Sequence, residues 1–228
     1  KDRFGAQIRT HYPLDTETEI EVVRQEATPF EALGLRVQVP DFMAEIVATI
    51  SHLARASAHI NQRSGVSVRL SISNYETLVA NAARRALRLG EKDVVPRVSD
   101  LEALASSTAG KVEIETLEEG RDEQIVERLV KSAVLTVFKD RCPMEQFRDI
   151  VLAFDEGTVV HAGDDIPSTS YVETVAAMPV LHAPVMALAG SETPAAVASA
   201  VEFVLEGLHL SKRLNKEAVA GRAAYRGR

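Results

Sequence analysis

Several residue types are scarce in this chain of 228 residues, and each scarcity excludes a class of protein. The single cysteine, Cys142, excludes an internal disulfide framework and is typical of a reducing cytosol. Tryptophan is absent and aromatic residues make up only 5% of the chain, which favours a core of small aliphatic contacts between helices. No uninterrupted apolar run approaches the roughly 20 residues of a membrane-spanning helix, and no secretory leader opens the sequence. We therefore expect a cytoplasmic protein with no membrane contact.

The charge balance narrows the possible partners. The formal net charge of the chain is −7. A protein that binds nucleic acid needs a basic surface, because its Lys and Arg side chains neutralise phosphates. We therefore expect no nucleic-acid partner. Hydrophobic residues make up 46% of the chain and charged residues 26%, the proportions of a globular protein with length enough for a sizeable core.

The first forty residues combine one strand pattern with one helix pattern. Apolar and polar side chains alternate from Ala6 to Tyr12, which predicts a strand that ends at Pro13. A strand is not stable alone, and no later segment offers a convincing partner. Thr16 and Glu19 have the spacing of a capping box and predict a short helix that runs to about residue 27. Residues 28–40 contain two prolines and a glycine and are interpreted as a connector.

A helical bundle is predicted for residues 41–112. Asp41 is expected to cap a first long helix, and Ser73 with Glu76 a second that stops at Gly90. Ser99 starts a shorter third helix. Short connections between helices favour a compact bundle, and residues 63–90 form its central stretch.

The second half is expected to be a helical extension. Periodic apolar residues predict a long helix from 118 to 140, and Met144 to Phe154 a further one after Cys142-Pro143. Residues 156–170 are interpreted as a loop, and residues 172–188 as short helices because of two prolines. Thr193-Pro194 predicts a helix to about residue 210, and the basic tail after it is expected to fray.

Few residues outside these helices suggest chemistry. His161 with Asp164 and Asp165 resembles a metal corner, but a turn-rich loop explains the same residues, and we predict no metal site. Cys142 is interpreted as a structural thiol. The helix over 194–210 carries Glu202 and Glu206, which favour a partner helix over a membrane surface.

Two segments resemble the magnesium-chelatase branch of the AAA+ ATPases. The opening Asp2-Arg3-Phe4-Gly5, followed by a strand, a proline and a capped helix, is similar to the end of the ATPase core. The stretch VSVRLSISNYETLVANAARRALRLGEKDVVPRVSDLEAL is similar to the helical lid. The match in order and spacing covers residues 2–105, and no resemblance extends beyond about residue 116. The resemblance implies a mainly α chain: the end of an AAA+ core over 1–30, a linker over 31–40, the lid over 41–112 and a helical extension over 113–228.

The resemblance also implies a ring-forming ATPase with ATP bound between subunits. Arg3 matches the arginine that stabilises the transferring phosphoryl group in the neighbouring subunit, and the alternative is an arginine that only anchors the strand. Arg69 matches the lid arginine that contacts ATP in its own subunit. Arg69 lies about one helical turn further ahead of Gly90 than the family spacing implies, so Arg63, Arg84 and Arg85 stay open as alternatives. Arg84, Arg85 and Arg88 also fit a solvated face near a helix C-terminus.

One absence limits what this chain does alone. It contains neither a G-x-x-x-x-G-K-[ST] loop nor an acidic Mg²⁺-binding strand. We therefore expect the ATP and Mg²⁺ site to lie mainly in residues before Lys1, so that this segment alone is not catalytic. The implied activity couples ATP hydrolysis to remodelling of a partner protein or to metal insertion, often with a partner that has a metal-dependent adhesion domain. The alternative is a non-enzymatic helical module for protein–protein interaction.

Overall fold

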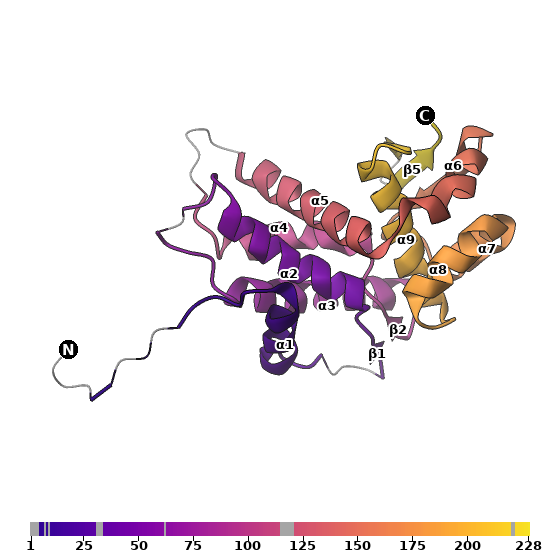
Figure 1. Cartoon of the computed structure of the whole chain (residues 1–228). Helices are drawn as coiled ribbons and strands as arrows, with labels where there is room; N and C mark the ends of the chain where they lie inside the picture. The colour runs from indigo at the N-terminus through magenta and orange to yellow at the C-terminus, as the bar shows by residue number, and fades with distance from the viewer. Residues whose placement is uncertain are drawn as a thin grey trace.

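The computed structural model describes residues 5–6, 8, 10–30, 34–61, 63–114, 121–219 and 222–228. It is mainly helical with a few short strands, as expected (Figure 1). The first half contains α1 (Thr16–Glu26), β1 (Arg36–Val37), α2 (Asp41–Ala56), α3 (Arg69–Leu89), β2 (Asp93–Val94), η1 (Val98–Ala103) and α4 (Leu104–Ala109). The second half contains α5 (Arg121–Arg141), η2 (Met144–Phe147), α6 (Arg148–Asp155), β3 (Val159–Ala162), α7 (Ser168–Ala177), η3 (Pro179–Leu181), α8 (His182–Ala189), α9 (Pro194–Leu210), β4 (Asn215–Val219) and β5 (Arg222–Arg226).

The strand predicted over residues 6–12 is wrong for the described part of that segment. Residues 5–6, 8 and 10–13 belong to no strand, and the chain runs away from the bundle towards its N-terminus (Figure 1). The alternation of side chains is present, but the described residues provide no neighbouring strand to pair with it. Tyr12 instead lies against Arg55 of α2, with the guanidinium carbon 4.8 Å from the ring centroid.

Helix starts are shifted where a tertiary contact competes with the local cap. In α1 the capping residue is Asp15, whose carboxylate accepts a hydrogen bond from the Thr18 N–H at 2.7 Å. Glu19 of the predicted capping box is instead buried against α2 and α3. The third helix, α3, begins at Arg69, four residues before the predicted Ser73. Its end at Gly90 is confirmed, because Gly90 adopts the left-handed conformation at φ 71°.

Two small sheets were not predicted. The connector contains β1, which pairs in parallel with β2. The interpretation of residues 156–170 as a loop is wrong at β3, and the prediction of a fraying tail is wrong because β4 and β5 form a hairpin. Together they make an antiparallel sheet in the order β3-β5-β4. The β1–β2 and β3–β5 pairings join residues roughly 57 to 67 positions apart, so no local pattern predicts them.

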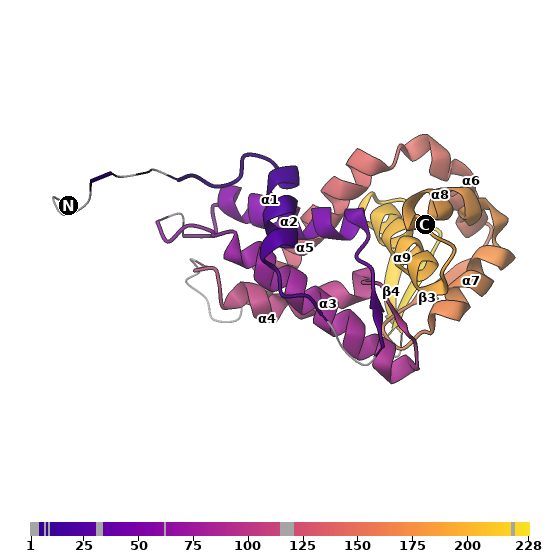
Figure 2. The ribbon, with the colours of Figure 1, turned by 90° about the horizontal axis from the view of Figure 1, so that it is seen from below.

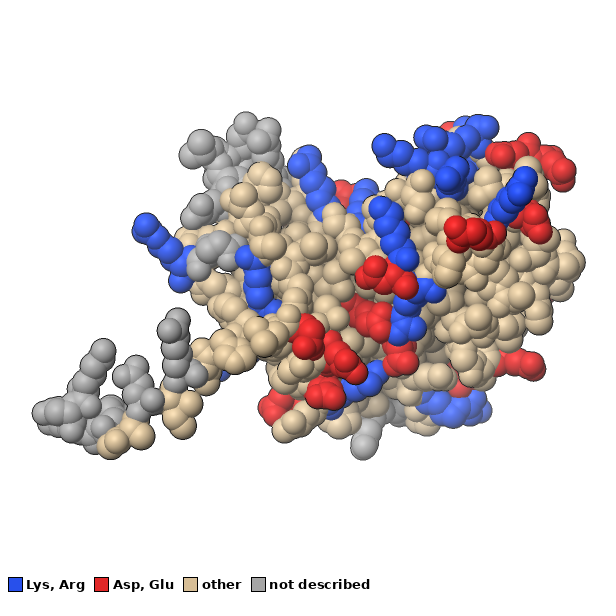
Figure 3. Space-filling model, viewed as in Figure 1, with Lys and Arg blue, Asp and Glu red and all other residues tan. Residues whose placement is uncertain are grey.

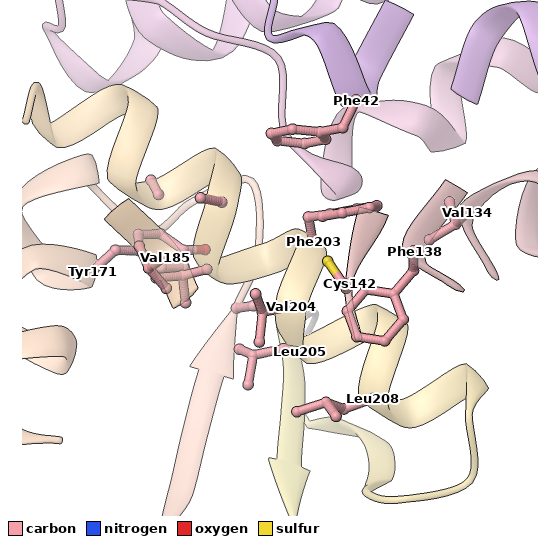
Figure 4. Close-up of a cluster of buried hydrophobic side chains, with 14 of the residues drawn as sticks. Phe42, Val134, Phe138, Cys142, Tyr171, Val185, Phe203, Val204, Leu205 and Leu208 are labelled. Carbon is pink, nitrogen blue, oxygen red and sulfur yellow. The ribbon is translucent and has the colours of Figure 1, made fainter. Parts of the chain in front are cut away.

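One hydrophobic core joins the two halves of the chain (Figure 4). Phe42 of α2 stacks on Phe203 of α9 with ring centroids 4.5 Å apart, and Phe138 of α5 meets Phe203 edge to face at 5.6 Å. Leu78 and Leu101 belong to the same cluster. The core therefore lies on both sides of the expected boundary after residue 112, and the division into domains stays a prediction.

Helix α9 is the central element of this core. All its residues from Ala195 to Leu208 are buried, including Glu202 and Glu206. The Tyr171 hydroxyl donates to Glu202 at 2.5 Å, and the Tyr225 hydroxyl donates to Glu206 at 2.5 Å. The polar face that suggested a partner helix is thus covered by this chain itself. Figure 2 shows α9 enclosed by α6, α7, α8 and the sheet.

Among the described residues, no single helix is both long enough and apolar enough to cross a membrane. The pair Ser168–Ala177 and Pro179–Ala189 is apolar and long enough only when its two parts, bent by 109°, are counted together.

Candidate functional site

The candidate site is the N-terminal end of α3, where Arg69 lies. Arg69 is the first residue of this helix, and its side chain is exposed. None of the ion pairs formed among the described residues involves its guanidinium. The other candidate, Arg3, lies outside the described residues. The structure therefore gives one of the two predicted residues a free, permanently charged group at a helix end.

A buried carboxylate fixes the surroundings of Arg69. Glu19 of α1 is fully buried and accepts two hydrogen bonds from Arg55 of α2, at 2.6 and 2.9 Å. It also accepts a hydrogen bond from the hydroxyl of Ser71, in the first turn of α3, at 2.5 Å. His52 Nε2 lies 2.9 Å from the same carboxylate. One carboxylate thus joins α1, α2 and the start of α3.

The loop before α3 is held by the same cluster. Arg55 Nε donates to the carbonyl oxygen of Val66 at 3.0 Å, only three residues before Arg69. Gly65 has a φ of 70°, and a Cβ there would lie 2.2 Å from the Tyr12 hydroxyl. A glycine is favoured at this position because of the positive φ, whereas the exposed Tyr12 side chain could move away from a Cβ. These contacts join Tyr12, α1, the end of the loop and the first turn of α3 next to Arg69.

The alternative arginines have different surroundings. Arg63 and Arg84 are exposed, and Arg84 donates to Asn81 of its own helix at 2.7 Å. Arg88 is exposed and pairs with Asp164 at 2.8 Å. The interpretation of Arg85 as part of a solvated face is wrong, because this side chain is only 2% exposed.

Arg85 belongs to a buried polar network between α3 and the second half of the chain. Its guanidinium donates to Asp100, with the shortest contact at 2.9 Å, and to the Val95 carbonyl at 2.8 Å. Arg97, fully buried, donates to the Ile166 carbonyl at 2.8 Å and to the Ser168 hydroxyl at 2.5 Å. Glu91 accepts from the Ser168 N–H at 2.6 Å, and so caps α7 from outside that helix.

This network continues into α9. The carboxylate of Glu202 accepts from the backbone N–H of Ser99 at 2.8 Å as well as from Tyr171. Burial raises the pKa of Glu202 above its ordinary value, although the charge of Arg97 opposes that rise. Arg97 also lies 5.0 Å from the centroid of the Tyr171 ring. Hydrogen bonds of this network therefore connect the C-terminal half of α3 to α7 and α9.

The remaining candidates, Asp164, Asp165 and Cys142, form ion pairs or are buried in the core. Asp164 pairs with Arg88 and Asp165 with Arg222, which lowers the pKa of Asp165. Among the residues that the structure describes, no group of three or more potential ligands gathers at one point. Cys142 is buried, and burial raises the pKa of its thiol to about 11, as befits an unreactive structural thiol.

Sequence reasoning missed the residues that position Arg69. The capping-box spacing predicts a cap role for Glu19, and no local pattern pairs it with His52. The available signal is that Glu19 lies four residues before the buried Val23, on the same face of α1, and that Arg55 follows in the next long helix. Comparison of the chain with protein-family models, curated proteins and solved structures finds no match in any of the three.

Proposed function

We propose that this chain is the lid and C-terminal extension of a chelatase-like AAA+ ATPase, which couples ATP hydrolysis to remodelling of a partner protein or to metal insertion. The observation that carries the proposal is the position of Arg69. Its guanidinium is exposed at the start of a long helix, and the helix start is fixed by the Glu19 cluster to the segment through which the chain enters.

Such an arginine is suited to bind a phosphate group that lies between the lid and a nucleotide-binding core. The guanidinium is always charged and offers several donors in a fixed plane, and no ion pair among the described residues competes for it. In the proposed protein Arg69 contacts the phosphates of ATP bound in its own subunit. The rigid connection through Glu19 and Arg55 then transmits the state of the nucleotide to the whole bundle.

The rest of the site would come from residues before Lys1. They would supply the phosphate-binding loop and the Mg²⁺ ligands, and Arg3 would act on ATP of the neighbouring subunit in a ring of identical chains. A partner with a metal-dependent adhesion domain is the client-binding component in this proposal, and the cytoplasm is its location.

The test uses the longer protein encoded by the reading frame that continues upstream of Lys1. We expect this protein to hydrolyse ATP, and we expect Arg69→Ala to lower turnover by about 100-fold, the loss typical when one donor to transition-state charge is removed. Arg3→Ala should also lower turnover. The matched control is Arg128→Ala, which removes an exposed arginine of α5 and should leave turnover unchanged.

Two results would overturn the proposal. A start codon directly before Lys1 would show that no nucleotide-binding core precedes it. Unchanged turnover in both Arg3→Ala and Arg69→Ala would reject the site, and a loss confined to Arg63→Ala or Arg84→Ala would move the role of Arg69 to those residues. The alternative, a helical interaction module without nucleotide, would then remain.

A further inference from the structure

Strand β3 has one free edge. In the order β3-β5-β4 it pairs only with β5, along all four of its residues. In antiparallel pairing every second residue directs its N–H and C=O to the neighbouring strand, so the other two residues of β3 direct theirs to the open side. Within the described part of the chain, no hydrogen bond reaches β3 from that side. These groups are a template for one more strand.

A groove lies beside this strand, lined on one side by β3 and on the other by α7. The groove has a volume of about 750 Å³. Residues 158–161 line one side without interruption, and Ser170, Thr174 and Ala177 of α7 line the other. At one end the Gly163 N–H donates to the Tyr171 hydroxyl at 3.1 Å, which fixes the separation of strand and helix.

The lining is more apolar than polar, and most of its polar residues carry no permanent charge. Val159 is 50% exposed and Val180 39% exposed, and Met178 and Pro179 complete the apolar end. The charged residues of the lining are Glu173 and Arg222, one of each sign, and Arg222 already pairs with Asp165 at 2.8 Å. The surface over α7 and α8 is mostly uncharged in Figure 3. A charged occupant would therefore find no net opposite charge in this groove.

We propose that the groove binds one extended, uncharged and apolar segment of another protein, which adds to β3 as a further strand. Backbone hydrogen bonds to the edge supply affinity, and apolar side chains on the segment contact Val159 and Val180. A second copy of this chain is a poorer occupant, because its β3 would bring β5 with it and α7 blocks the room for a sheet. This docking site is independent of the proposed ATPase activity.

The test selects binders from a displayed library of random peptides, with the full chain as the target. We expect the selected peptides to be uncharged, apolar and rich in β-branched residues. Ala177→Trp, which fills the groove from α7, should weaken their binding at least tenfold. Ala187→Trp, at an exposed alanine of α8 outside the groove, is the matched control and should bind as the wild type does.

A second pair of variants keeps the test decisive if Ala177→Trp does not fold. Val159→Lys places a charge at the strand edge and should weaken binding similarly, whereas Leu152→Lys changes an equally exposed residue of α6 and should not. Hydrogen exchange should show β3 amides protected by the selected peptide. A peptide N-methylated at alternate residues should not bind.

Three results would overturn the proposal. These are a selection that yields no peptides or mainly charged ones, equal binding by the N-methylated peptide, and a dimer of the chain in sedimentation that Ala177→Trp dissociates. The last result would assign the groove to a second copy.

Discussion

The carboxylate of Glu19 is fully buried, and its burial is tolerated only because other side chains pair with it. A buried carboxylate loses its hydration, and only paired donors compensate for that loss. Arg55, Ser71 and His52 surround it, from two different helices. Removing the charge would leave the Arg55 guanidinium, itself mostly buried, without its counter-charge.

We expect Glu19→Gln to lower the free energy of unfolding by about 3 kcal/mol, the cost of breaking a buried ion pair from one side. Urea unfolding followed by circular dichroism measures this loss. Glu17→Gln changes an exposed glutamate in the first turn of the same helix and should cost less than about 1 kcal/mol. Equal losses in both variants would contradict the role of the buried cluster.

Glu202 gives stability an unusual dependence on pH. Burial raises its folded-state pKa above the ordinary value of 4.5, even though Arg97 opposes the rise and Asp100 adds to it. Above pH 4.5 the unfolded chain releases this proton while the folded chain retains it, so the contribution of Glu202 falls as the pH rises towards its folded pKa. Most exposed paired carboxylates, such as Asp165, act in the opposite direction.

Glu202→Gln should therefore be more destabilising at pH 4.5 than at pH 7. Urea unfolding of the wild type and the variant at several pH values between these limits measures the difference. Asp165→Asn should show the opposite trend at lower pH, because the pKa of the Asp165 carboxyl is lowered and its pairing with Arg222 is lost only as the pH falls below the ordinary value of 3.8. A cost of Glu202→Gln that grew with pH would show that Glu202 is ionised in the folded state.

At the scale of elements, α9 packs closely against Phe138 of α5 at Gly207. A Cβ at this position would lie 2.1 Å from the ring of Phe138, so the helices would have to separate. We expect Gly207→Ala to destabilise the protein by about 1 to 2 kcal/mol, since overpacking outweighs the gain in helix propensity.

The control for Gly207 is Gly110, which follows α4. A Cβ at Gly110 meets only the Ser106 carbonyl oxygen at 3.9 Å, and Gly110→Ala should be neutral or slightly stabilising. Thermal unfolding of both variants distinguishes packing from backbone entropy. A neutral Gly207→Ala would mean that Phe138 moves away without cost.

Elements with strong local signals could be predicted from the sequence. Thr193-Pro194 starts α9, Gly90 ends α3, and Cys142-Pro143 follows the end of α5, because each signal acts within one turn of helix. The start of α3 and the three-stranded sheet could not be predicted, since both depend on residues distant in sequence. The basic composition of the tail predicts a frayed segment, yet Lys216 and Tyr225 both hydrogen-bond to Glu206 of α9.

The candidate site was predicted only in part. Arg69 is exposed, as a phosphate-binding residue must be, but its contact with nucleotide stays a prediction. Arg85 shows the limit of periodicity, because an arginine at a seemingly polar position is buried by elements that fold over it from later in the chain. Burial of a charge becomes predictable only when its partner, here Asp100, is known.

At the scale of the whole molecule, the largest hydrophobic cluster crosses the boundary of the predicted lid. Phe42, Leu78 and Leu101 of the lid belong to the same buried cluster as side chains of α5 and α9. A fragment of residues 41–112 would expose these side chains, and we expect it not to fold cooperatively. Urea unfolding followed by circular dichroism should show one sharp transition for the full chain and none for the fragment.

The complementary measurement adds residues 113–228 to the fragment as a separate chain. Recovery of a cooperative transition on mixing would support the shared core. A fragment that unfolds sharply by itself would instead establish the lid as an independent domain, as the sequence suggested.

The burial of α9 on every side also determines when the hydrophobic core can form during synthesis. Residues 194–210 are synthesised after α2 and α5, and until then the aromatic side chains of α2 and α5 lack the helix that they contact. Nascent chains would therefore display an open apolar cleft until α9 has been made. They are natural clients for chaperones that bind such surfaces.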